Sequence, residues 1–308
     1  METEVTLIEV APRDGFQSVK EMITTSDKLA IIAALARAGL QHIEVGSFVS
    51  PKAIAQMADI APVLQGVAQL PQSFECIVLV PNRRGAQLAT EHVCQRLNFV
   101  FSASETHNLN NVNKTLSQSL AELRQVQSVV ERSERLSLRV SLATSFDCPF
   151  SGKVNAQHTL ALFQQVLDIS PDAQLALCDT TGRAHPFAVR SLFERALALI
   201  AKPEQLIFHC HDTYGLAIAN VAAAFEVGVR SFDTAVAGFG GCPFAPGASG
   251  NVATEDVVYF FESAGISTGV DSEKLKEAIA LAEQIKGAQL GGSIRLLNRS
   301  KREASADA

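Results

Sequence analysis

Eight short apolar segments, each rich in strand-forming residues, alternate along the chain with segments of helical spacing. Near-continuous apolar strands are typical of a parallel sheet that helices cover on both faces. Eight strand and helix units within ~250 residues have the size of a (β/α)8 barrel, a TIM barrel of the α/β class. We therefore predict this fold, with strands in residues 5–10, 42–48, 74–80, 96–104, 136–146, 173–180, 206–214 and 231–239.

The helical segments between these strands complete the predicted barrel. They are residues 26–40, 52–65, 84–93, 115–132, 157–169, 187–200, 215–227 and 254–264. An open doubly wound sheet is the alternative, but no GxGxxG follows the first strand, where a dinucleotide-binding fold carries it. We expect one catalytic domain over residues 1–287, including an additional C-terminal helix at 272–287, and a partly disordered tail over 288–308.

Composition narrows the classes of partner and compartment. The 308 residues carry a net charge of -6, which gives no long-range attraction to nucleic acid or to an acidic membrane. No apolar stretch reaches the ~20 residues of a membrane span, and the acidic residues 1–12 do not resemble a secretion signal. The six cysteines form no CxxC pair, so we expect reduced thiols in a cytoplasmic protein.

Polar residues gather where the predicted strands end. In a barrel of this type, catalytic residues lie at the carboxyl ends of the strands, so these residues are expected at one rim. They are Arg13 and Asp14 after the first strand, Glu44 and Ser47 on the second, Asp179 and Thr180 ending the sixth, and His209 and His211 on the seventh.

The HCHD stretch is the most specific local signal in the chain. On a strand, residues two apart face the same side, so His209 and His211 present both imidazoles to the barrel interior, roughly 6.5 to 7 Å apart at Cα. They form either half of a metal site or a hydrogen-bonded pair in the core. Cys210 then faces the helices as a small buried hydrophobe, and Asp212 is placed to orient one histidine ring.

A ligand set needs more members than two histidines. Asp14 is the third candidate, if closure of the barrel brings the first and seventh strands close together, and Asn251 is the fourth. Imidazole, carboxylate and amide ligands without a thiolate suit Mg²⁺ or Mn²⁺ with open positions better than a closed structural zinc site. The pattern therefore indicates a catalytic metal rather than a structural one.

The loop at residues 238–251 contains five glycines and one cysteine, Cys242. Its glycines permit unusual backbone angles and a close approach to a ligand. Cys242 has no apolar run around it, so a structural role in the core is unfavourable. Either the loop is a flexible connection, or it carries a thiol that transfers a proton above the metal site.

Six motifs along the chain point to one known family. They are PRDGFQ (12–17), residues 43–59, NNVNKT (110–115), CPFSGKV (148–154), HCHDTYG (209–215) and residues 240–259. Together, from about residue 5 to 270, they resemble the 3-hydroxy-3-methylglutaryl-CoA lyase family of metal-dependent barrels. The segment GGCPFAPGASGN is the one specific to lyases, because HxHD and RDG also occur in the related isopropylmalate and homocitrate synthases.

The resemblance implies a role for each of these residues. It implies a Mg²⁺ or Mn²⁺ ion held by Asp14, His209, His211 and Asn251, and catalysis by Arg13, Asp14 and Cys242. Residues expected to bind the acyl part of the substrate are Arg13, Gln17, Glu44, Ser47, Asp179 and Thr180, and those expected near coenzyme A are Asn110, Asn111 and Asn113. For Glu44, a structural pairing with Arg13 is the alternative.

The implied activity is a retro-Claisen cleavage of 3-hydroxy-3-methylglutaryl-CoA to acetyl-CoA and acetoacetate, a step of leucine degradation and ketogenesis. Either Asp14 or His209 is the general base, and a homodimer is the usual assembly of similar lyases. Thr181 and Arg183 depart from the usual pattern of the family, as do Ser18 and Val19. A lyase for a related substrate, of the isohexenylglutaryl or citramalyl type, is therefore an alternative.

Three further functions fit less well. A condensing synthase of the same superfamily normally carries an additional C-terminal domain, and only ~40 residues follow the predicted barrel here. A Schiff-base aldolase needs a lysine inside the barrel, and none of the eight apolar segments contains one. A non-catalytic barrel that binds coenzyme A or a metal would not need Cys242 together with a full ligand set.

Overall fold

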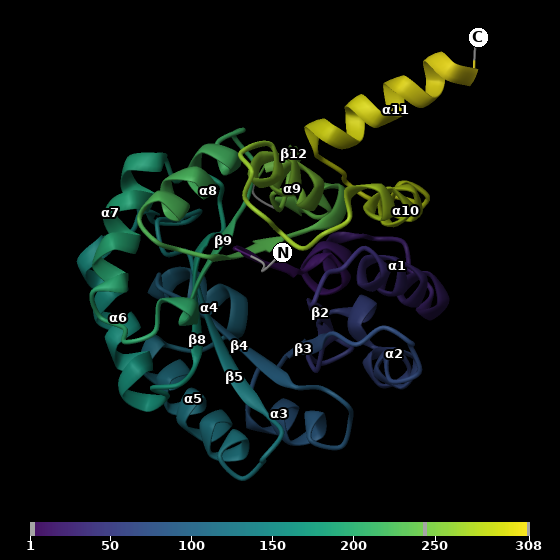
Figure 1. Cartoon of the computed structure of the whole chain (residues 1–308). Coiled ribbons are helices and arrows are strands. Elements are labelled where there is room, and N and C mark those ends of the chain that lie inside the picture. Colours follow the sequence, from purple (N-terminus) through teal and green to yellow (C-terminus); the bar gives the residue numbers. More distant parts are fainter. Residues whose placement is uncertain (1–3, 243–244, 307–308) are drawn as a thin grey trace.

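The computed structural model describes residues 4–242 and 245–306, with the side chains of 241, 242, 245–249 and 301–306 outside that description. Eight parallel strands close into a barrel in the order β1-β10-β9-β8-β5-β4-β3-β2 (Figure 1). They are β1 (Thr6–Glu9), β2 (His42–Ser47), β3 (Glu75–Leu79), β4 (Arg96–Ser102), β5 (Ser137–Ala143), β8 (Gln174–Asp179), β9 (Leu206–Cys210) and β10 (Ser231–Thr234). Every strand lies within its predicted segment, and the predicted fold is confirmed.

Eight helices surround the barrel, one after each strand (Figure 1). Capping side chains fix several of their first turns: the α1 helix begins after Thr24, whose side chain accepts from the Asp27 amide at 3.1 Å, and Thr115 forms a capping box with Gln118. The helices are α1 (Thr25–Arg37), α2 (Ile60–Val67), α3 (Arg83–Ala89), α5 (Leu116–Val130), α6 (Ala156–Ile169), α7 (Pro186–Leu197), α8 (Ala217–Glu226) and α9 (Thr254–Ser263).

The loops at the carboxyl ends of the strands contain structure that periodicity does not indicate. Helix α4 (Glu105–Val112) follows β4, and its polar sequence ETHNLNNV shows no apolar stripe. Two short hairpins, β6 (Asp147–Cys148) with β7 (Gly152–Lys153) and β11 (Gly241–Cys242) with β12 (Ala245–Ser249), follow β5 and β10. Strands of two residues, such as β6, β7 and β11, are too short to show a pattern of alternation.

Five single helical turns complete the loops. Two of them follow β1 directly, and they place the residues of the PRDGFQ motif. The turns are Ala11–Gly15, Phe16–Ser18, Ala55–Met57, Pro203–Gln205 and Val236–Gly238.

Two helices follow the barrel at its C-terminal end. Helix α10 (Ser272–Glu283) packs against α1, where the sequence predicts the additional helix. Helix α11 (Ser293–Ala306) then projects away from the barrel (Figure 1), whereas the sequence predicts a partly disordered tail. Asp256 of α9 explains the difference, because its carboxylate accepts from the amides of Ser293 and Ile294, each at 2.8 Å.

Apolar side chains from the barrel strands and from the helices around them form one buried core. Within the described chain, no helix has the length and apolarity that a bilayer requires. The cysteines whose side chains are described, Cys76, Cys94, Cys148, Cys178 and Cys210, are buried and free. Burial raises the pKa of the Cys210 thiol well above its usual range, as expected of a cysteine that acts as a core residue.

Candidate metal centre

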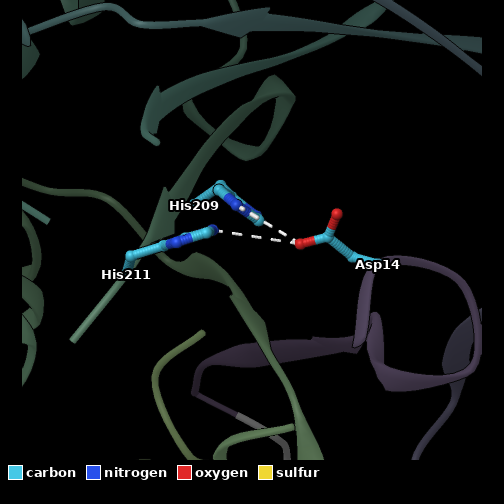
Figure 2. Close-up of side chains that lie close together, drawn as sticks. All are labelled: Asp14, His209 and His211. Carbon is cyan, nitrogen blue, oxygen red and sulfur yellow. Dashed lines mark ion pairs between the residues drawn. The ribbon is translucent and has the colours of Figure 1, made fainter. Parts of the chain in front are cut away.

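Asp14, His209 and His211 converge at the carboxyl end of the barrel. The Asp14 Oδ2 atom lies 4.0 Å from Nε2 of His209 and 3.9 Å from Nε2 of His211. Figure 2 shows both imidazoles directed at this carboxylate from the β9 side, with Asp14 approaching from the turn after β1. Within the described residues, this is the one group of three potential ligands close enough to share an ion.

The turn at Ala11–Gly15 aims Asp14 at the histidines. The amides of Arg13 and Asp14 both donate to the Val10 carbonyl, at 3.1 and 2.7 Å, which folds the chain back immediately after β1. A Cβ atom at Gly15 would lie 3.0 Å from the Cβ of Phe239, so glycine allows this turn to contact the loop after β10.

The His209 ring is oriented by Asp233 of β10. Its Nδ1 lies 2.9 Å from Asp233 Oδ2, and Nε2 consequently faces Asp14. The sequence analysis assigned such a role to Asp212, and this prediction is wrong: the Asp212 carboxylate accepts from the Ala217 amide at the start of α8, at 3.0 Å. Asp233 is paired in register with His209, and its one sequence signal is an aspartate within the apolar segment SFDTAV.

The His211 ring is held in its neutral form. Burial and the neighbouring His209 lower the pKa of His211 to about 4. The negative charge of Asp14 raises this pKa, but by less than the other two effects lower it. The His211 Nδ1 is buried and has no hydrogen-bond partner among the described residues. A neutral imidazole can present an unprotonated Nε2, the nitrogen that faces Asp14, to a metal ion.

Asp14 is ionised. Burial alone would raise its pKa, but the Arg13 guanidinium, the two imidazoles and the Asn251 amide hold the pKa of Asp14 well below its usual range. Its Oδ1 accepts from Arg13 at 2.5 Å and from Gln17 at 2.9 Å. The site thus offers one carboxylate and two imidazole nitrogens, a donor set that fits Mg²⁺ or Mn²⁺.

Asn251, the fourth predicted ligand, also lies at this cluster. Its side-chain nitrogen donates to Asp14 Oδ2 at 2.9 Å and to the Phe239 carbonyl at 3.2 Å. The backbone of Asn251 forms a bridge with that of His211, which joins the loop after β10 to the end of β9. The structure therefore brings together all four residues that the resemblance implies as ligands.

Arg13 lies between two carboxylates. Its Nε donates to Glu44 at 2.7 Å, and its Nη1 donates to Asp14. Glu44 is fully buried, and its second oxygen accepts from Asn98 at 2.7 Å. Both Glu44 oxygens therefore have protein partners, which is the structural pairing that the sequence left as the alternative to substrate binding.

The remaining residues assigned to the acyl part shape the loops at the same end of the barrel. Burial raises the pKa of Asp179 to about 6, and its carboxylate accepts from the amides of Arg183 and Ala184 at 3.1 and 3.0 Å. Thr180 accepts from the Thr144 amide at 2.9 Å, and Ser47 accepts from the Val49 amide at 3.1 Å.

The residues predicted near coenzyme A lie apart from these contacts. Asn110, Asn111 and Asn113 are exposed at the end of α4, which Asn113 terminates with a left-handed conformation (φ 53°). Cys242 belongs by its backbone to β11, and its side chain lies outside the described part of the structure.

Arg183 links three of the loops at this end of the barrel. Its Nη1 donates to Asp147 of the first hairpin at 3.0 Å, and its Nε donates to the Tyr214 hydroxyl at 3.3 Å. Asp147 also accepts from Thr181 at 3.3 Å. Two of the residues that depart from the expected pattern, Thr181 and Arg183, thus contact the same half-buried aspartate, Asp147.

Comparison with known proteins gives one consistent family. The family model described as HMGL-like matches residues 4–281. Hydroxymethylglutaryl-CoA lyase YngG of Bacillus subtilis is 40% identical over 287 residues, which cover 93% of this chain and 95% of that protein. The mitochondrial hydroxymethylglutaryl-CoA lyase of Macaca fascicularis is 38% identical over 275 residues, covering 89% and 83% of the two chains.

Solved structures agree with this result over nearly the whole chain. The crystal structure of the HMG-CoA lyase of Bacillus subtilis superposes with a TM-score of 0.91 at 38% identity, covering 97% of this chain and 99% of that one. An HMG-CoA lyase of Acinetobacter baumannii in complex with coenzyme A and 3-methylmalate has a TM-score of 0.83 at 40% identity, with 90% of each chain covered.

Proposed function

The chain belongs to the HMGL-like family, and from this premise we propose that it cleaves 3-hydroxy-3-methylglutaryl-CoA to acetyl-CoA and acetoacetate. The observation that carries the proposal is the convergence of Asp14, His209 and His211 beside Arg13 at the carboxyl end of the barrel. Relatives named for this lyase activity are 37 to 40% identical to the chain.

A divalent cation fits the donor set of the site, with Asp14, His209, His211 and Asn251 as the residues that would hold it. Bound Mg²⁺ or Mn²⁺ would lower the pKa of the substrate hydroxyl and fix the reacting groups in position. Asp233 supports the same assignment, since a histidine ligand typically donates its second ring nitrogen to a carboxylate or carbonyl.

The reaction that we propose is a retro-Claisen cleavage. A base, Asp14 or His209, removes the proton of the 3-hydroxyl group; the C3 ketone forms as the bond between C2 and C3 breaks. The bonding electrons pass to the thioester half, which leaves as an enolate. We assign stabilisation of the enolate oxygen to Arg13, whose Nη2 has no protein partner within the described residues.

A proton must then reach C2 of the enolate to complete acetyl-CoA. We assign this step to Cys242, which the β11–β12 hairpin carries in the loop directly preceding Asn251. A thiol is a competent general acid, and loss of such a group typically lowers the rate by 10²- to 10⁴-fold. The thiolate that remains recovers a proton from solvent before the next turnover.

The same proposal covers the partners of the chain. Coenzyme A accompanies the lyase of Acinetobacter baumannii, and we place it here near Asn110, Asn111 and Asn113 of the loop after β4. A cytoplasmic homodimer without nucleic-acid or membrane partners remains our expectation, which light scattering on the purified protein and cell fractionation test directly.

The decisive experiment combines metal removal with one histidine variant. EDTA should abolish release of acetyl-CoA from 3-hydroxy-3-methylglutaryl-CoA in a coupled assay, and Mn²⁺ or Mg²⁺ should restore it. His211→Ala should lose both bound Mn²⁺ and activity, whereas His92→Ala, in the loop before β4, should keep both. Stoichiometric Mn²⁺ retained by His211→Ala would contradict the ligand set, and absence of acetyl-CoA with the metal restored would contradict the activity.

The charge and the contacts of Arg183 favour a second candidate function, cleavage of a different substrate. Its guanidinium, tied to Asp147 and Tyr214, changes the charge of the loop that Asp179 anchors beside the site. A related 3-hydroxyacyl-CoA with a different acyl tail is therefore the alternative. Turnover of longer-tailed analogues should be compared with that of 3-hydroxy-3-methylglutaryl-CoA in the wild type and in Arg183→Val; a higher kcat/KM for a longer tail would favour the alternative.

A further inference from the structure

The barrel interior beneath the metal centre contains a connected series of polar side chains that the proposed reaction does not use. Arg139 of β5 lies at its middle and is 1% exposed. Its Nη1 donates to Asp233 Oδ1 at 2.9 Å, and its Nη2 donates to Asp233 Oδ2. Arg139 and Asp233 thus form a two-pronged ion pair across the barrel, between strands β5 and β10.

A second arm leads from Arg139 to Arg13. The Arg139 Nε donates to the Ser141 hydroxyl at 3.2 Å, and this hydroxyl donates to Asn98 Oδ1 at 2.9 Å. The Asn98 amide nitrogen donates to Glu44, which in turn accepts from Arg13. Arg13 contacts Asp14, and Asp14 faces His209. Since His209 is in turn paired with Asp233, the series closes at the ion pair between Arg139 and Asp233.

The direction of each hydrogen bond in this series is determined by chemistry. Arginine can only donate and an ionised carboxylate can only accept. Asp233 Oδ2 accepts from Arg139 and is also the partner of His209 Nδ1, at 2.9 Å. The shared bond to His209 must therefore be donated by Nδ1–H, which leaves Nε2 as the ring nitrogen directed at Asp14, as Figure 2 shows for the ring orientation.

From this geometry we infer that Arg139 is a positioning residue of the metal centre, which fixes the tautomer and the orientation of His209 through Asp233. The inference rests on the proposed function, because it assigns His209 Nε2 as a metal ligand. Without Arg139, the Asp233 carboxylate would lose both of its guanidinium bonds and the orientation that they impose. Asp233 would then no longer hold the His209 ring in one position.

Mn²⁺ binding by the full-length protein tests the inference without any acyl-CoA. Free Mn²⁺ is followed by electron paramagnetic resonance while it is titrated into metal-free protein. Loss of a group that orients a metal ligand typically weakens metal affinity 10- to 100-fold. Arg139→Met should raise the Mn²⁺ dissociation constant by about this factor, and its kcat should recover toward wild type at saturating Mn²⁺ while its activity at low Mn²⁺ stays depressed.

Two matched variants separate positioning from general damage. Arg96→Gln also removes an arginine from a barrel strand, but Arg96 pairs with Glu75 at 2.7 Å and takes no part in this series. It should leave the Mn²⁺ dissociation constant unchanged even if it lowers thermal stability. Arg139→Lys keeps the positive charge without the two-pronged geometry, so it should bind Mn²⁺ more weakly than wild type and more tightly than Arg139→Met.

The variants remain informative if Arg139→Met fails to fold. Asp233→Asn preserves volume but places an amide nitrogen where one of the donors of Arg139 or His209 needs an acceptor, and it should also raise the dissociation constant. An unchanged dissociation constant in folded Arg139→Lys and Asp233→Asn overturns the inference, whatever the protein cleaves. Wild-type protein that binds Mn²⁺ but releases no acetyl-CoA overturns the proposed function and leaves the inference standing.

Discussion

Replacement of Glu44 by glutamine tests whether this residue holds Arg13 or binds substrate. Glutamine has the same shape, but it carries one acceptor and one donor group where Glu44 carries two acceptors. In the structure, both Glu44 oxygens accept a hydrogen bond at 2.7 Å, from Arg13 Nε and from Asn98 Nδ2. One of these donors must therefore face the new amide NH₂ group, without an acceptor.

The surrounding contacts prevent a simple repair of this conflict. Asn98 could turn its oxygen toward the new amide, but the Ser141 hydroxyl, which donates to Asn98 Oδ1 at 2.9 Å, would then lose its acceptor. The expected cost is about 3–5 kcal/mol, the magnitude found when one partner of a buried ion pair is removed. For a chain of this size, that corresponds to a decrease in melting temperature of about 5–10 °C.

Thermal and urea unfolding of the metal-free protein measure this loss, and the coupled acetyl-CoA assay measures kcat and KM. A freed Arg13 should lower kcat, because its guanidinium no longer keeps one position beside Asp14. Glu75→Gln is the matched control. Glu75 pairs with Arg96 and His42, but its side chain is 19% exposed. This variant should therefore lose less stability than Glu44→Gln, and its kcat should not change. A Glu44→Gln protein with unchanged stability and a raised KM would refute the pairing and favour substrate binding.

Four further predictions address other parts of the molecule. Cys242→Ala should lower kcat by about 10²-fold or more with Mn²⁺ binding intact, as expected for loss of a general acid; full activity in the coupled assay would contradict the assignment. Burial raises the pKa of Glu255 to about 8, so the folded state retains a proton that the unfolded chain has released. The free energy of unfolding should consequently fall between about pH 5 and pH 8, with a smaller fall in Glu255→Gln; identical urea-unfolding profiles across this range would argue against a buried, protonated Glu255. Asp256→Ala removes the acceptor of the Ser293 and Ile294 amides and should speed hydrogen exchange at the start of α11, at a cost of about 1 kcal/mol; exchange as slow as in wild type would mean that another group caps this helix. Mn²⁺ at 100 times its dissociation constant should stabilise the protein by about 2.7 kcal/mol, and thermal unfolding of His211→Ala should not respond to it.

The fold could be predicted from the sequence because each unit of the barrel repeats the same local pattern. A strand such as VTLIEV, followed by a capped helix, can be predicted from its own residues, without knowledge of the strands that pair with it. The start of α11 is the opposite case: its capping carboxylate belongs to Asp256, which is 37 positions from Ser293. No local pattern connects these two residues.

The same distinction separates the ligands of the candidate site from the residues that support them. His209 and His211 stand out because two histidines at a spacing of two are rare on a buried strand. Asp233 and Arg139 each interrupt an apolar segment, but they are 94 positions apart, and only the register of the closed barrel shows that they form a pair. Asp212 was the more obvious partner for a histidine in the sequence, yet its side chain turns toward the start of α8.

Charge across the connected side chains explains why the site suits an anionic substrate. Arg13 and Arg139 supply two positive charges, and Asp14, Glu44 and Asp233 supply three negative ones, so these five side chains carry a net charge of one negative unit. With a divalent cation bound, the balance becomes one positive charge. The acyl part of 3-hydroxy-3-methylglutaryl-CoA carries one free carboxylate and therefore neutralises the site on binding. Because all three guanidinium nitrogens of Arg139 are paired inside the barrel, the cation and Arg13 are left to attract the substrate. Removal of the metal should therefore weaken acyl-CoA binding as well as catalysis.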